Sequence, residues 1–426
     1  MKKGRIKNFN ELAINDNRKS ILSIVEAGLD FIDTEKVVFN SIKLKDNILS
    51  IHEENFDLSK FKRIKIVGFG KASCQAAMAL ERILGNKIEE GVVIGLEKTV
   101  CERVQTFAGS HPRPSTMNIA AGKKIYDIAN QSKEDDLIIA IVSGGGSALL
   151  CPTNAECEQG IKLYDLSIQC GEKITELNTI RKHLSLLKGG GLAKIAYPAT
   201  VIGLIFSDVP GNNFEDVASG PTYKDETTVH DAERIIKEHN LGAFILNETP
   251  KEDKYFEKVH NFILVSNKNA MEGMKKKSEE LGFKADIIST EFYDEIDEVL
   301  KKIFSARAEN TVVLGAGEPG IDIKNKEGKG GRNMHAGLEA VRMNLIDQNS
   351  VFISFASDGL DNTDGAGAIV DKNTIEKIKK IGLNIGDYLN RFDSYSVFEK
   401  TGDMIMTGPT GANVSDLMIL LTKNEQ

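Results

Sequence analysis

Short β-branched runs that end near a glycine, each followed by a helical stretch, are the feature that most constrains the fold of this chain. They recur along the whole sequence and are apolar throughout, which is typical of strands buried on both faces of a parallel sheet. The predicted strands are residues 64–68, 92–94, 137–142 and 200–206 in the first half, and 262–265, 286–288, 311–314 and 351–355 in the second. Each half therefore predicts an α/β/α, Rossmann-like fold with a mainly parallel sheet.

The length predicts two domains. A chain of 426 residues exceeds what one hydrophobic core usually serves, and it fits two domains of roughly 150–250 residues each. Between about residues 222 and 258 the sequence becomes crowded with charge and carries one amphipathic helix, near residues 231–239. We place the boundary here, with an N-terminal domain at residues 1–225 and a C-terminal domain at residues 226–426.

The charge and the apolar runs exclude several classes of partner. Lys and Arg number 54 against 62 Asp and Glu, and this net charge of -8 argues against binding to nucleic acid or an anionic membrane. The longest apolar runs, near 137–142 and 201–206, are far shorter than the roughly 20 residues of a membrane helix, and no apolar leader follows the basic start. Five scattered cysteines without a Cys-x-x-Cys pair predict reduced thiols in the cytoplasm.

The first glycine loop, Gly68-Phe-Gly-Lys-Ala-Ser73, follows a predicted strand and precedes a helix. A dinucleotide-binding loop would have a third glycine in place of Ser73, and Glu97 would supply the acid that binds ribose. Lys71 inside the loop suits phosphoryl transfer better, since an ammonium group there would lie beside bound phosphates. An ordinary turn with a solvated lysine is an equally open interpretation.

The second loop is a predicted phosphate cradle. It consists of Ser143, Gly144, Gly145, Gly146 and Ser147, which end the most apolar strand and open a helix. Consecutive glycines let the backbone approach an anion closely.

A helix predicted at residues 178–188 carries Arg181, Ser185 and Lys188 on one face and ends at a run of glycines. Two cations beside a glycine break would suit a polyphosphate. A basic face that is simply solvated is the commoner case and remains the alternative.

Acidic residues follow two more strands. Asp208 lies just past residues 200–206, at the edge where open α/β sheets carry their sites, and Asp358, Asp361 and Asp364 follow residues 351–355. One or two of these carboxylates would suffice for Mg²⁺, which takes its other ligands from substrate and water. Most of them could equally be turn formers. Nearby, Lys329 and Arg332 lie on a glycine-rich segment, where an arginine fork can stabilise a phosphoryl group in transfer.

Taken in order, these segments resemble the glycerate 2-kinases whose C-terminal half is called the MOFRL domain. The matching stretches begin near residue 60 and run to the C-terminus. They are residues 67–72, 109–112, 143–150, 187–190, 207–211, 218–222, 328–333, 356–359 and 407–414. Each stretch alone is weakly specific, and nine in the family's order are strongly so.

The resemblance implies an ATP-dependent kinase that phosphorylates the C2 hydroxyl of D-glycerate with a divalent metal, Mg²⁺ or another. It also implies an active site in the cleft between two α/β domains. Lys71 and Arg332 match the family's positively charged pair, and Asp208 matches its acidic residue.

From these residues we form specific hypotheses about the site. The loop Ser143–Ser147, the turn of Lys188, Gly189 and Gly190, and Asn333 would bind the nucleotide. Ser110 and His111 would bind the glycerate carboxylate, and Lys71 and Arg332 would also bind the substrate. Asp208 or Asp358 would hold the metal, and Asp208 could instead orient the attacking hydroxyl.

Two other functions stay open on the sequence alone. One is an NAD(P)H-dependent hydroxypyruvate reductase that uses Gly68 to Gly70 and Glu97. The other is a non-catalytic protein that binds a nucleotide or small anion. A homodimer is expected from the prevalence of such assemblies.

Overall fold

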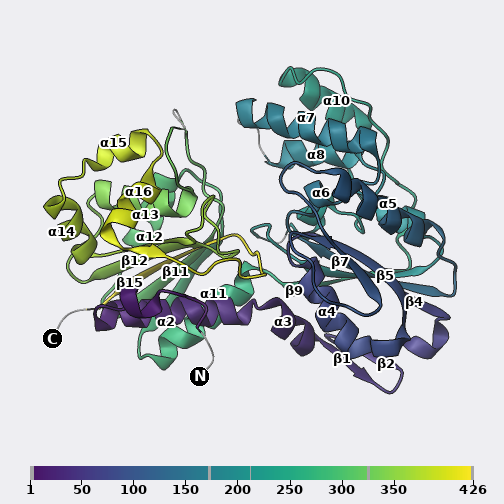
Figure 1. Ribbon diagram of the computed structural model, residues 1–426, viewed down its shortest axis with the longest axis horizontal. Helices are drawn as coiled ribbons and strands as arrows, with labels where there is room; N and C mark the ends of the chain where they lie inside the picture. Colours follow the sequence, from purple (N-terminus) through teal and green to yellow (C-terminus); the bar gives the residue numbers. More distant parts are fainter. Residues whose placement is uncertain (1–3, 171–173, 212, 324–326, 424–426) are drawn as a thin grey trace. The chain divides into compact units, whose positions relative to one another are not determined.

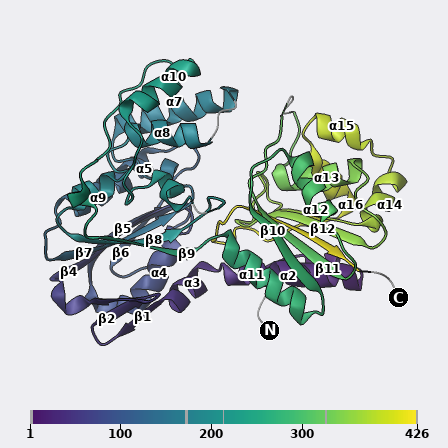
Figure 2. The same ribbon diagram turned by 180° about the vertical axis from the view of Figure 1, so that it is seen from behind.

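The computed structural model describes residues 4–170, 174–211, 213–323 and 327–423 and contains two compact units (Figures 1 and 2). The N-terminal unit comprises Thr34–Val209 and Asn213–Leu264. The C-terminal unit comprises the described residues from Val265 onward, those before Thr34, and the short segment at Pro210 and Gly211.

The boundary expected between residues 225 and 226 therefore falls inside the N-terminal unit. The charged segment after residue 225 is not a linker, because its helix α10 (Val229–Glu238) buries an apolar face against two earlier helices, α7 (Asn154–Cys170) and α8 (Ile174–Leu184). Ile235 and Leu163 are among the side chains of this small cluster.

The N-terminal unit is built on a six-stranded sheet of order β6-β5-β4-β7-β8-β9. The strands are β4 (Arg63–Phe69), β5 (Ile88–Gly95), β6 (Val104–Ala108), β7 (Asp136–Ser143), β8 (Thr200–Phe206) and β9 (Val259–Val265). The pairs β5–β6, β4–β5, β4–β7 and β7–β8 are parallel. The winding reverses between β4 and β7, which makes their carboxyl ends the topological switch point of a doubly wound sheet.

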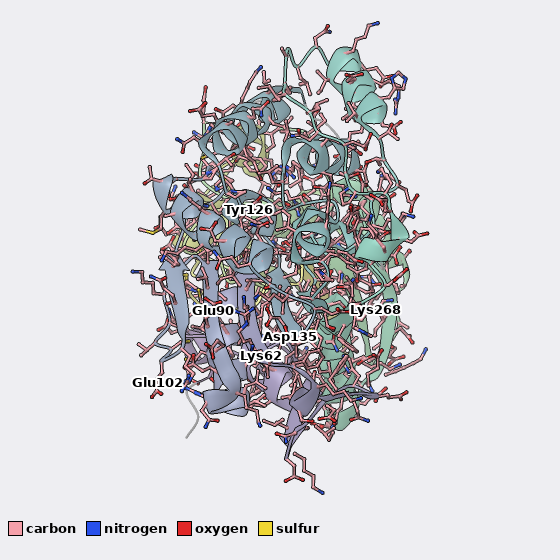
Figure 3. The ribbon with its side chains drawn as sticks, turned by 90° about the vertical axis from the view of Figure 1, so that its right-hand side faces the viewer. Lys62, Glu90, Glu102, Tyr126, Asp135 and Lys268 are labelled. Carbon is pink, nitrogen blue, oxygen red and sulfur yellow. The ribbon has the colours of Figure 1, made fainter. Side chains whose placement is uncertain are left out.

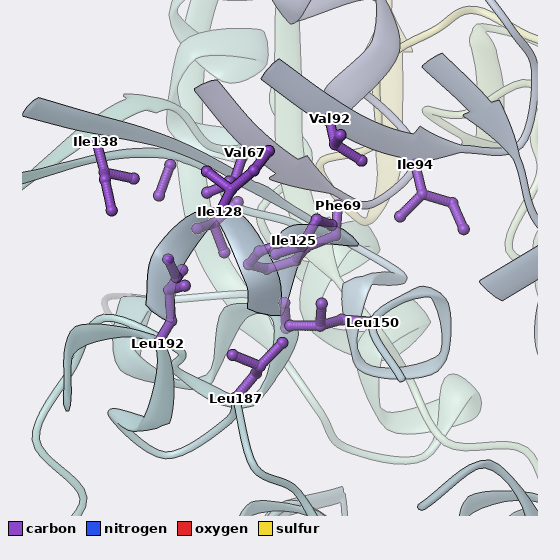
Figure 4. Close-up of a cluster of buried hydrophobic side chains, with 14 of the residues drawn as sticks. Val67, Phe69, Val92, Ile94, Ile125, Ile128, Ile138, Leu150, Leu187 and Leu192 are labelled. Carbon is purple, nitrogen blue, oxygen red and sulfur yellow. The ribbon is translucent and has the colours of Figure 1, made fainter. Parts of the chain in front are cut away.

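Helices cover both faces of this sheet (Figures 1 and 2). On one face lie α3 (Thr34–Ser41) and α4 (Ser73–Leu84); on the other lie α5 (Thr116–Asn130), α6 (Gly146–Leu149) and α9 (Gly191–Ala196). Figure 4 shows the core of the second face, where Ile125 and Ile128 of α5 and Leu192 of α9 lie against sheet residues such as Val67 and Phe69. A small antiparallel sheet of β1 (Ile42–Lys45), β2 (Ile48–Ile51) and β3 (Glu54–Asp57) was not expected from the sequence.

Ion pairs close the amino ends of the central strands. Arg63 donates to both carboxylate oxygens of Asp136, with an Nε–Oδ1 distance of 2.8 Å, and Lys65 Nζ lies 3.3 Å from Glu90 Oε1. Figure 3 shows Glu90 near Lys62 and Asp135, which join the starts of β4 and β7 through a backbone bond of 2.7 Å. The glycine loops lie at the opposite, carboxyl ends of these strands.

The C-terminal unit has a mixed sheet, so the expectation of a mainly parallel one is corrected for this half. Its order is β10-β11-β15-β12-β13-β14, and among these neighbours only β10 and β11 are parallel. The strands are β10 (Lys284–Phe292), β11 (Thr311–Gly317), β12 (Ser350–Ala356), β13 (Gly367–Val370), β14 (Met404–Ile405) and β15 (Asp416–Thr422). The segment between β14 and β15 contains no helix, and a parallel connection usually needs a crossover helix. β15 accordingly runs antiparallel to both of its neighbours, β11 and β12.

Helices also cover both faces of the mixed sheet. On one face lie α2 (Asp16–Phe31) and α11 (Asn267–Glu280); on the other lie α12 (Ile296–Ser305), α13 (Arg332–Arg342), α14 (Lys372–Lys380), α15 (Ile385–Asn390) and α16 (Ser394–Thr401), and α1 (Phe9–Leu12) precedes α2. Arg18 anchors α2 from a fully buried position: its Nε donates to Asp371 Oδ2 at 2.8 Å and its Nη1 to Asp403 Oδ1 at 2.7 Å. In the part of the chain that the structure describes, no helix combines the length and the apolar character needed to cross a bilayer.

Candidate active site

Both predicted glycine loops of the N-terminal unit lie at the switch point of its sheet, and they are bonded to each other. The N–H of Lys71 donates to the carbonyl of Gly144 at 2.8 Å, and that of Ala72 to Ser143 Oγ at 3.1 Å. Gly70 has a φ of +120°, and a Cβ on it would lie 2.2 Å from the carbonyl oxygen of Ser143. A glycine at this position is therefore required for the two loops to approach.

The amides of the first loop are already used within the protein. The N–H groups of Gly70, Lys71, Ala72 and Ser73 donate, respectively, to Ile94 O, Gly144 O, Ser143 Oγ and Gly70 O. A dinucleotide-binding loop needs such amides for the pyrophosphate. This arrangement disfavours the reductase interpretation and leaves the side chain of Lys71 as the loop's chemically useful group.

Three predicted site residues converge on the second loop. A Cβ built on Gly145 would lie 3.2 Å from His111 Cδ2 and 3.3 Å from Lys71 Cγ. A Cβ on Gly144 would lie 2.0 Å from Asp208 Oδ2. The loop is thus in close contact with a cation, an imidazole and a carboxylate that come from three different strand ends.

The backbone of this loop has donors to offer. Within the described residues, the amides of Gly145, Gly146 and Ser147 have no acceptor, as is usual for the first turn of a helix. The hydroxyl of Ser143 has a different role from the one predicted. It is 1% exposed and accepts from Ala72 N–H while bonding to Ser73 Oγ at 3.2 Å, so it fixes the loops together rather than facing a ligand.

The turn at Lys188 does not have the phosphate-binding geometry that the sequence predicted. Lys188 is buried, and its Nζ donates to Leu150 O and Glu156 Oε1 at 2.7 Å each and to Ser185 Oγ at 3.3 Å. All three ammonium protons are therefore in use.

The adjacent glycines are also committed to internal bonds. The amides of Gly189 and Gly190 donate at 2.8 Å to the carbonyls of Ser219 and Gly220. Gly189 and Gly190 thus anchor this turn to residues 219 and 220, Lys188 anchors it to Leu150 and Glu156, and their amides and ammonium are not available to a nucleotide.

The segment of Ser110 and His111 is exposed and held by Asn118. Ser110 N–H donates to Asn118 Oδ1 at 2.9 Å, and Asn118 Nδ2 donates back to Ser110 O at 3.1 Å. Asn118 was missed in the sequence analysis, although its place in a capping box with Ser115 was a readable signal. Binding of the glycerate carboxylate by Ser110 and His111 stays a prediction.

Arg332 is the first residue of α13 in the C-terminal unit. Its Nη1 lies 2.7 Å from Asp416 Oδ2 and 3.8 Å from Glu318 Oε2. Burial acts to lower the pKa of Arg332, but the charges of Asp416 and Glu318 raise it overall. Asp416 opens β15, far along the chain from Arg332, and no local sequence signal predicts its role.

Asn333 is a positioning residue rather than a nucleotide ligand. It is 1% exposed, donates to Asp361 Oδ1 at 3.2 Å and Asp416 Oδ1 at 2.7 Å, and accepts from Ser354 Oγ at 2.6 Å. These bonds occupy the amide, which corrects the prediction of direct nucleotide binding.

The three aspartates after β12 have different surroundings. Asp361 accepts the backbone amides of Asn333 and Met334 at the start of α13, and burial together with the charge of Asp416 raises the pKa of Asp361 to about 7. Asp364 is exposed and lies 3.5 Å from Lys329 Nζ. Asp358 accepts the Leu360 amide at 3.1 Å.

The two predicted metal ligands belong to different units: Asp208 lies in the N-terminal unit and Asp358 in the C-terminal unit. Over the described ranges, no three His, Cys, Asp or Glu side chains form a group that could hold a metal ion. A carboxylate such as Asp208 beside a glycine loop still fits Mg²⁺, which binds through one or two carboxylates and substrate oxygens.

The strand order makes this an α/β protein with a doubly wound sheet, and its glycine loops lie at the switch point, the edge where such sheets usually bind their ligands. Residues 20–249 match a family described as a domain of unknown function, DUF4147, and residues 311–416 match the MOFRL family. The chain is 34% identical to a glycerate 2-kinase of Pyrococcus horikoshii over 96% of this chain and 98% of that protein. It belongs to the glycerate 2-kinase family.

A solved structure and a differently named relative complete the comparison. The crystal structure of a glycerate kinase from Thermotoga maritima superposes with a TM-score of 0.81 at 30% identity, covering 95% of this chain and 99% of that one. A relative from Agrobacterium vitis, 32% identical over 84% of this chain and 87% of its own length, carries a provisional name, hydroxypyruvate reductase.

Proposed function

We propose that this protein transfers the γ-phosphoryl group of ATP to the C2 hydroxyl of D-glycerate, giving 2-phospho-D-glycerate and ADP. The protein is an enzyme, a kinase that phosphorylates glycerate, and ATP is its phosphate donor. The observation that carries the proposal is the convergence of Lys71, His111 and Asp208 on the loop Gly144–Gly145, in a chain that aligns almost end to end with glycerate 2-kinases.

Phosphoryl transfer depends on positioning and on neutralising charge. The amides of Gly145 to Ser147 supply donors for the nucleotide phosphates, and Lys71 supplies a positive charge next to the same loop. Arg332 supplies a planar guanidinium, which Asp416 holds in one orientation. Lys71 and Arg332 belong to different units, and we propose that both cations take part in the reaction.

The acceptor side uses the remaining groups of the loop. Ser110 and His111 bind the glycerate carboxylate. Asp208 either orients the C2 hydroxyl and takes its proton or, with Asp358, contributes to holding Mg²⁺. Bound Mg²⁺ supplies charge neutralisation on the phosphates.

The assembly and location are proposals of the same kind. We propose a homodimer, the commonest soluble assembly. Cys74, Cys101, Cys151 and Cys157 are free thiols, which supports a reducing compartment such as the cytoplasm.

A single assay separates the candidate functions. Purified protein is incubated with D-glycerate, ATP and Mg²⁺, ADP release is followed, and ³¹P NMR identifies the product. We expect ADP release and phosphate on C2. Phosphate on C3 would overturn the regiochemistry, oxidation of NADH or NADPH by hydroxypyruvate would establish the reductase, and ligand-induced stabilisation without ADP release would indicate a non-catalytic binding protein.

A further inference from the structure

A line of polar side chains leads from the glycine loop to helix α8. Ser147 Oγ bonds to Ser219 Oγ at 2.8 Å, and Ser219 Oγ donates to Asn178 Oδ1 at 3.4 Å. The same amide oxygen accepts Nη1 of Arg181 at 3.3 Å. Arg181 thus lies two side chains away from Ser147, within the same unit.

The turn that presents Ser219 is held in a costly backbone conformation. Ala218 and Ser219 have φ values of +52° and +60°, a region that residues with a Cβ rarely adopt twice in succession. Such conformations persist where the surrounding structure enforces them, and they concentrate at functional sites. Here the carbonyl of Ser219 is also fixed by Gly189 N–H.

Arg181 differs from the cations next to it, because none of the described acidic side chains forms an ion pair with it. Lys188 pairs with Glu156 at 2.7 Å, and Lys182 lies 3.2 Å from Asp216 and 3.4 Å from Asp225. Arg181 has no carboxylate within ion-pair distance among the residues that the structure describes.

The surroundings of Arg181 make this isolation costly. Burial lowers the pKa of Arg181, and the nearby phenol of Tyr164 opposes that effect. Arg181 is half-buried, and a guanidinium partly withdrawn from water without a counter-charge is stabilised when an anion is supplied.

We propose that Arg181 binds a phosphate group of the nucleotide. Together with Lys71, it would be one of two cations in the site of the N-terminal unit. The inference rests on the proposed kinase function. A guanidinium offers two parallel N–H donors that match two phosphate oxygens. The hydroxyls of Ser147 and Ser219 lie along the path between Arg181 and the loop, and the loop adds its own amides, so a multi-oxygen anion is the ligand that this set of donors suits.

The test compares Arg181→Gln and Arg181→Lys with the wild type. Glutamine keeps a donor for Asn178 but removes the charge, and lysine keeps the charge but removes the fork. Initial rates are measured with ATP and D-glycerate varied separately. We expect the KM for ATP to rise about 10- to 100-fold in Arg181→Gln and less in Arg181→Lys, with the KM for D-glycerate nearly unchanged. The matched control is Arg234→Gln, since Arg234 is an exposed arginine of the same unit that pairs with Glu238 at 3.1 Å.

Direct binding and thermal unfolding keep the inference testable apart from catalysis. Calorimetric titration with ADP or inorganic triphosphate should show weaker binding to Arg181→Gln, whether or not the wild type turns over glycerate. The melting temperature should stay equal or rise, because an unpaired cation has been removed. Unchanged nucleotide affinity, a rise confined to the KM for D-glycerate, or a melting temperature lowered with affinity intact would each overturn the proposal.

Discussion

Nη1 of Arg332 lies 2.7 Å from Oδ2 of Asp416, although the two residues are 84 positions apart in the chain. The other carboxylate oxygen of Asp416 accepts the side chain of Asn333, so one acid holds two consecutive residues at the start of α13. The direction of the Arg332 fork is therefore set by β15.

Replacing Asp416 by Ala should lower kcat with a smaller change in the KM for either substrate. The guanidinium of Arg332 would remain charged but lose its fixed orientation. An arginine that is not held in place stabilises the transition state much less. We expect a loss of about 10- to 100-fold, measured by steady-state kinetics. Asp364→Ala is the matched control, since that aspartate is exposed and pairs only loosely with Lys329. Wild-type turnover in Asp416→Ala would show that Arg332 needs no such support.

Replacing Lys71 by Ala should lower kcat by about 10²- to 10³-fold without unfolding the protein. Lys71 is only partly buried, and its backbone bond to Gly144 is kept in the variant. Kinetics together with a thermal melt check both halves of the expectation. Lys98→Ala, at an exposed lysine of the same unit, serves as the control. Near wild-type turnover in Lys71→Ala would contradict a role for this ammonium in the reaction.

Replacing Gly144 by Ala should impair activity through Asp208. The new methyl group would lie 2.0 Å from Asp208 Oδ2, so the carboxylate would have to move away from the loop. We expect kcat to fall by at least about 10-fold in a folded protein. Gly160→Ala in α7, where the added methyl meets nothing within 4 Å, should keep full activity and gain about 0.5–1 kcal/mol in the free energy of unfolding. Equal activity of the Gly144→Ala and Gly160→Ala variants would show that the position of Asp208 does not affect the reaction.

Replacing Arg18 by Ala should destabilise the C-terminal unit by about 3–5 kcal/mol. The substitution would leave the buried carboxylates of Asp371 and Asp403 without their main counter-charge. Urea unfolding followed by circular dichroism measures the effect. The exposed pair of Arg234 and Glu238 provides the comparison, since Arg234→Ala should change the free energy of unfolding by less than about 0.5 kcal/mol. Similar losses in both variants would mean that the buried ion pairs of Arg18 with Asp371 and Asp403 contribute little to the free energy of unfolding.

Cys74 should resist alkylation in the native protein. Burial raises the pKa of the Cys74 thiol to about 12, so the thiol stays protonated far above neutral pH, and only about one molecule in 10⁴ carries the reactive thiolate at pH 8. Mass spectrometry after treatment with iodoacetamide, with and without denaturant, checks this. Cys101, which is less buried, is the internal reference. Rapid modification of native Cys74 would show that the helix α4 opens readily.

The sequence predicted most of the strands near the site because these are long, apolar and closed by glycine. Residues 200–206 were predicted with the bounds that β8 has, and residues 137–142 lie inside β7. The sheet β1–β3 was missed, since its four-residue strands are partly exposed and lack a continuous apolar run. The mixed order of the second sheet was also missed, because a strand buried on both faces reads the same in either direction.

The site was predictable by residue type and less so by role. Lys71 and Asp208 were identified because strand ends and glycine turns mark them locally, whereas His111 was identified only through the resemblance to the family. The internal bonds that occupy the side chains of Lys188 and Asn333 could not be predicted, since their partners Glu156 and Asp416 come from distant parts of the chain. The same holds for the amides of Gly189 and Gly190, whose acceptors belong to another turn.

The place of α2 in the C-terminal unit has a consequence for biosynthesis. Arg18 leaves the ribosome 353 residues ahead of Asp371 and 385 ahead of Asp403, so the helix is made first and its buried ion pairs can form only when translation is nearly finished. Until then Ile21, Leu22 and Val25, which the finished protein buries completely, lack the strands that cover them. The N-terminal unit has no such delay. A nascent chain should complete the fold of this unit before the strands that cover helix α2 have been synthesised.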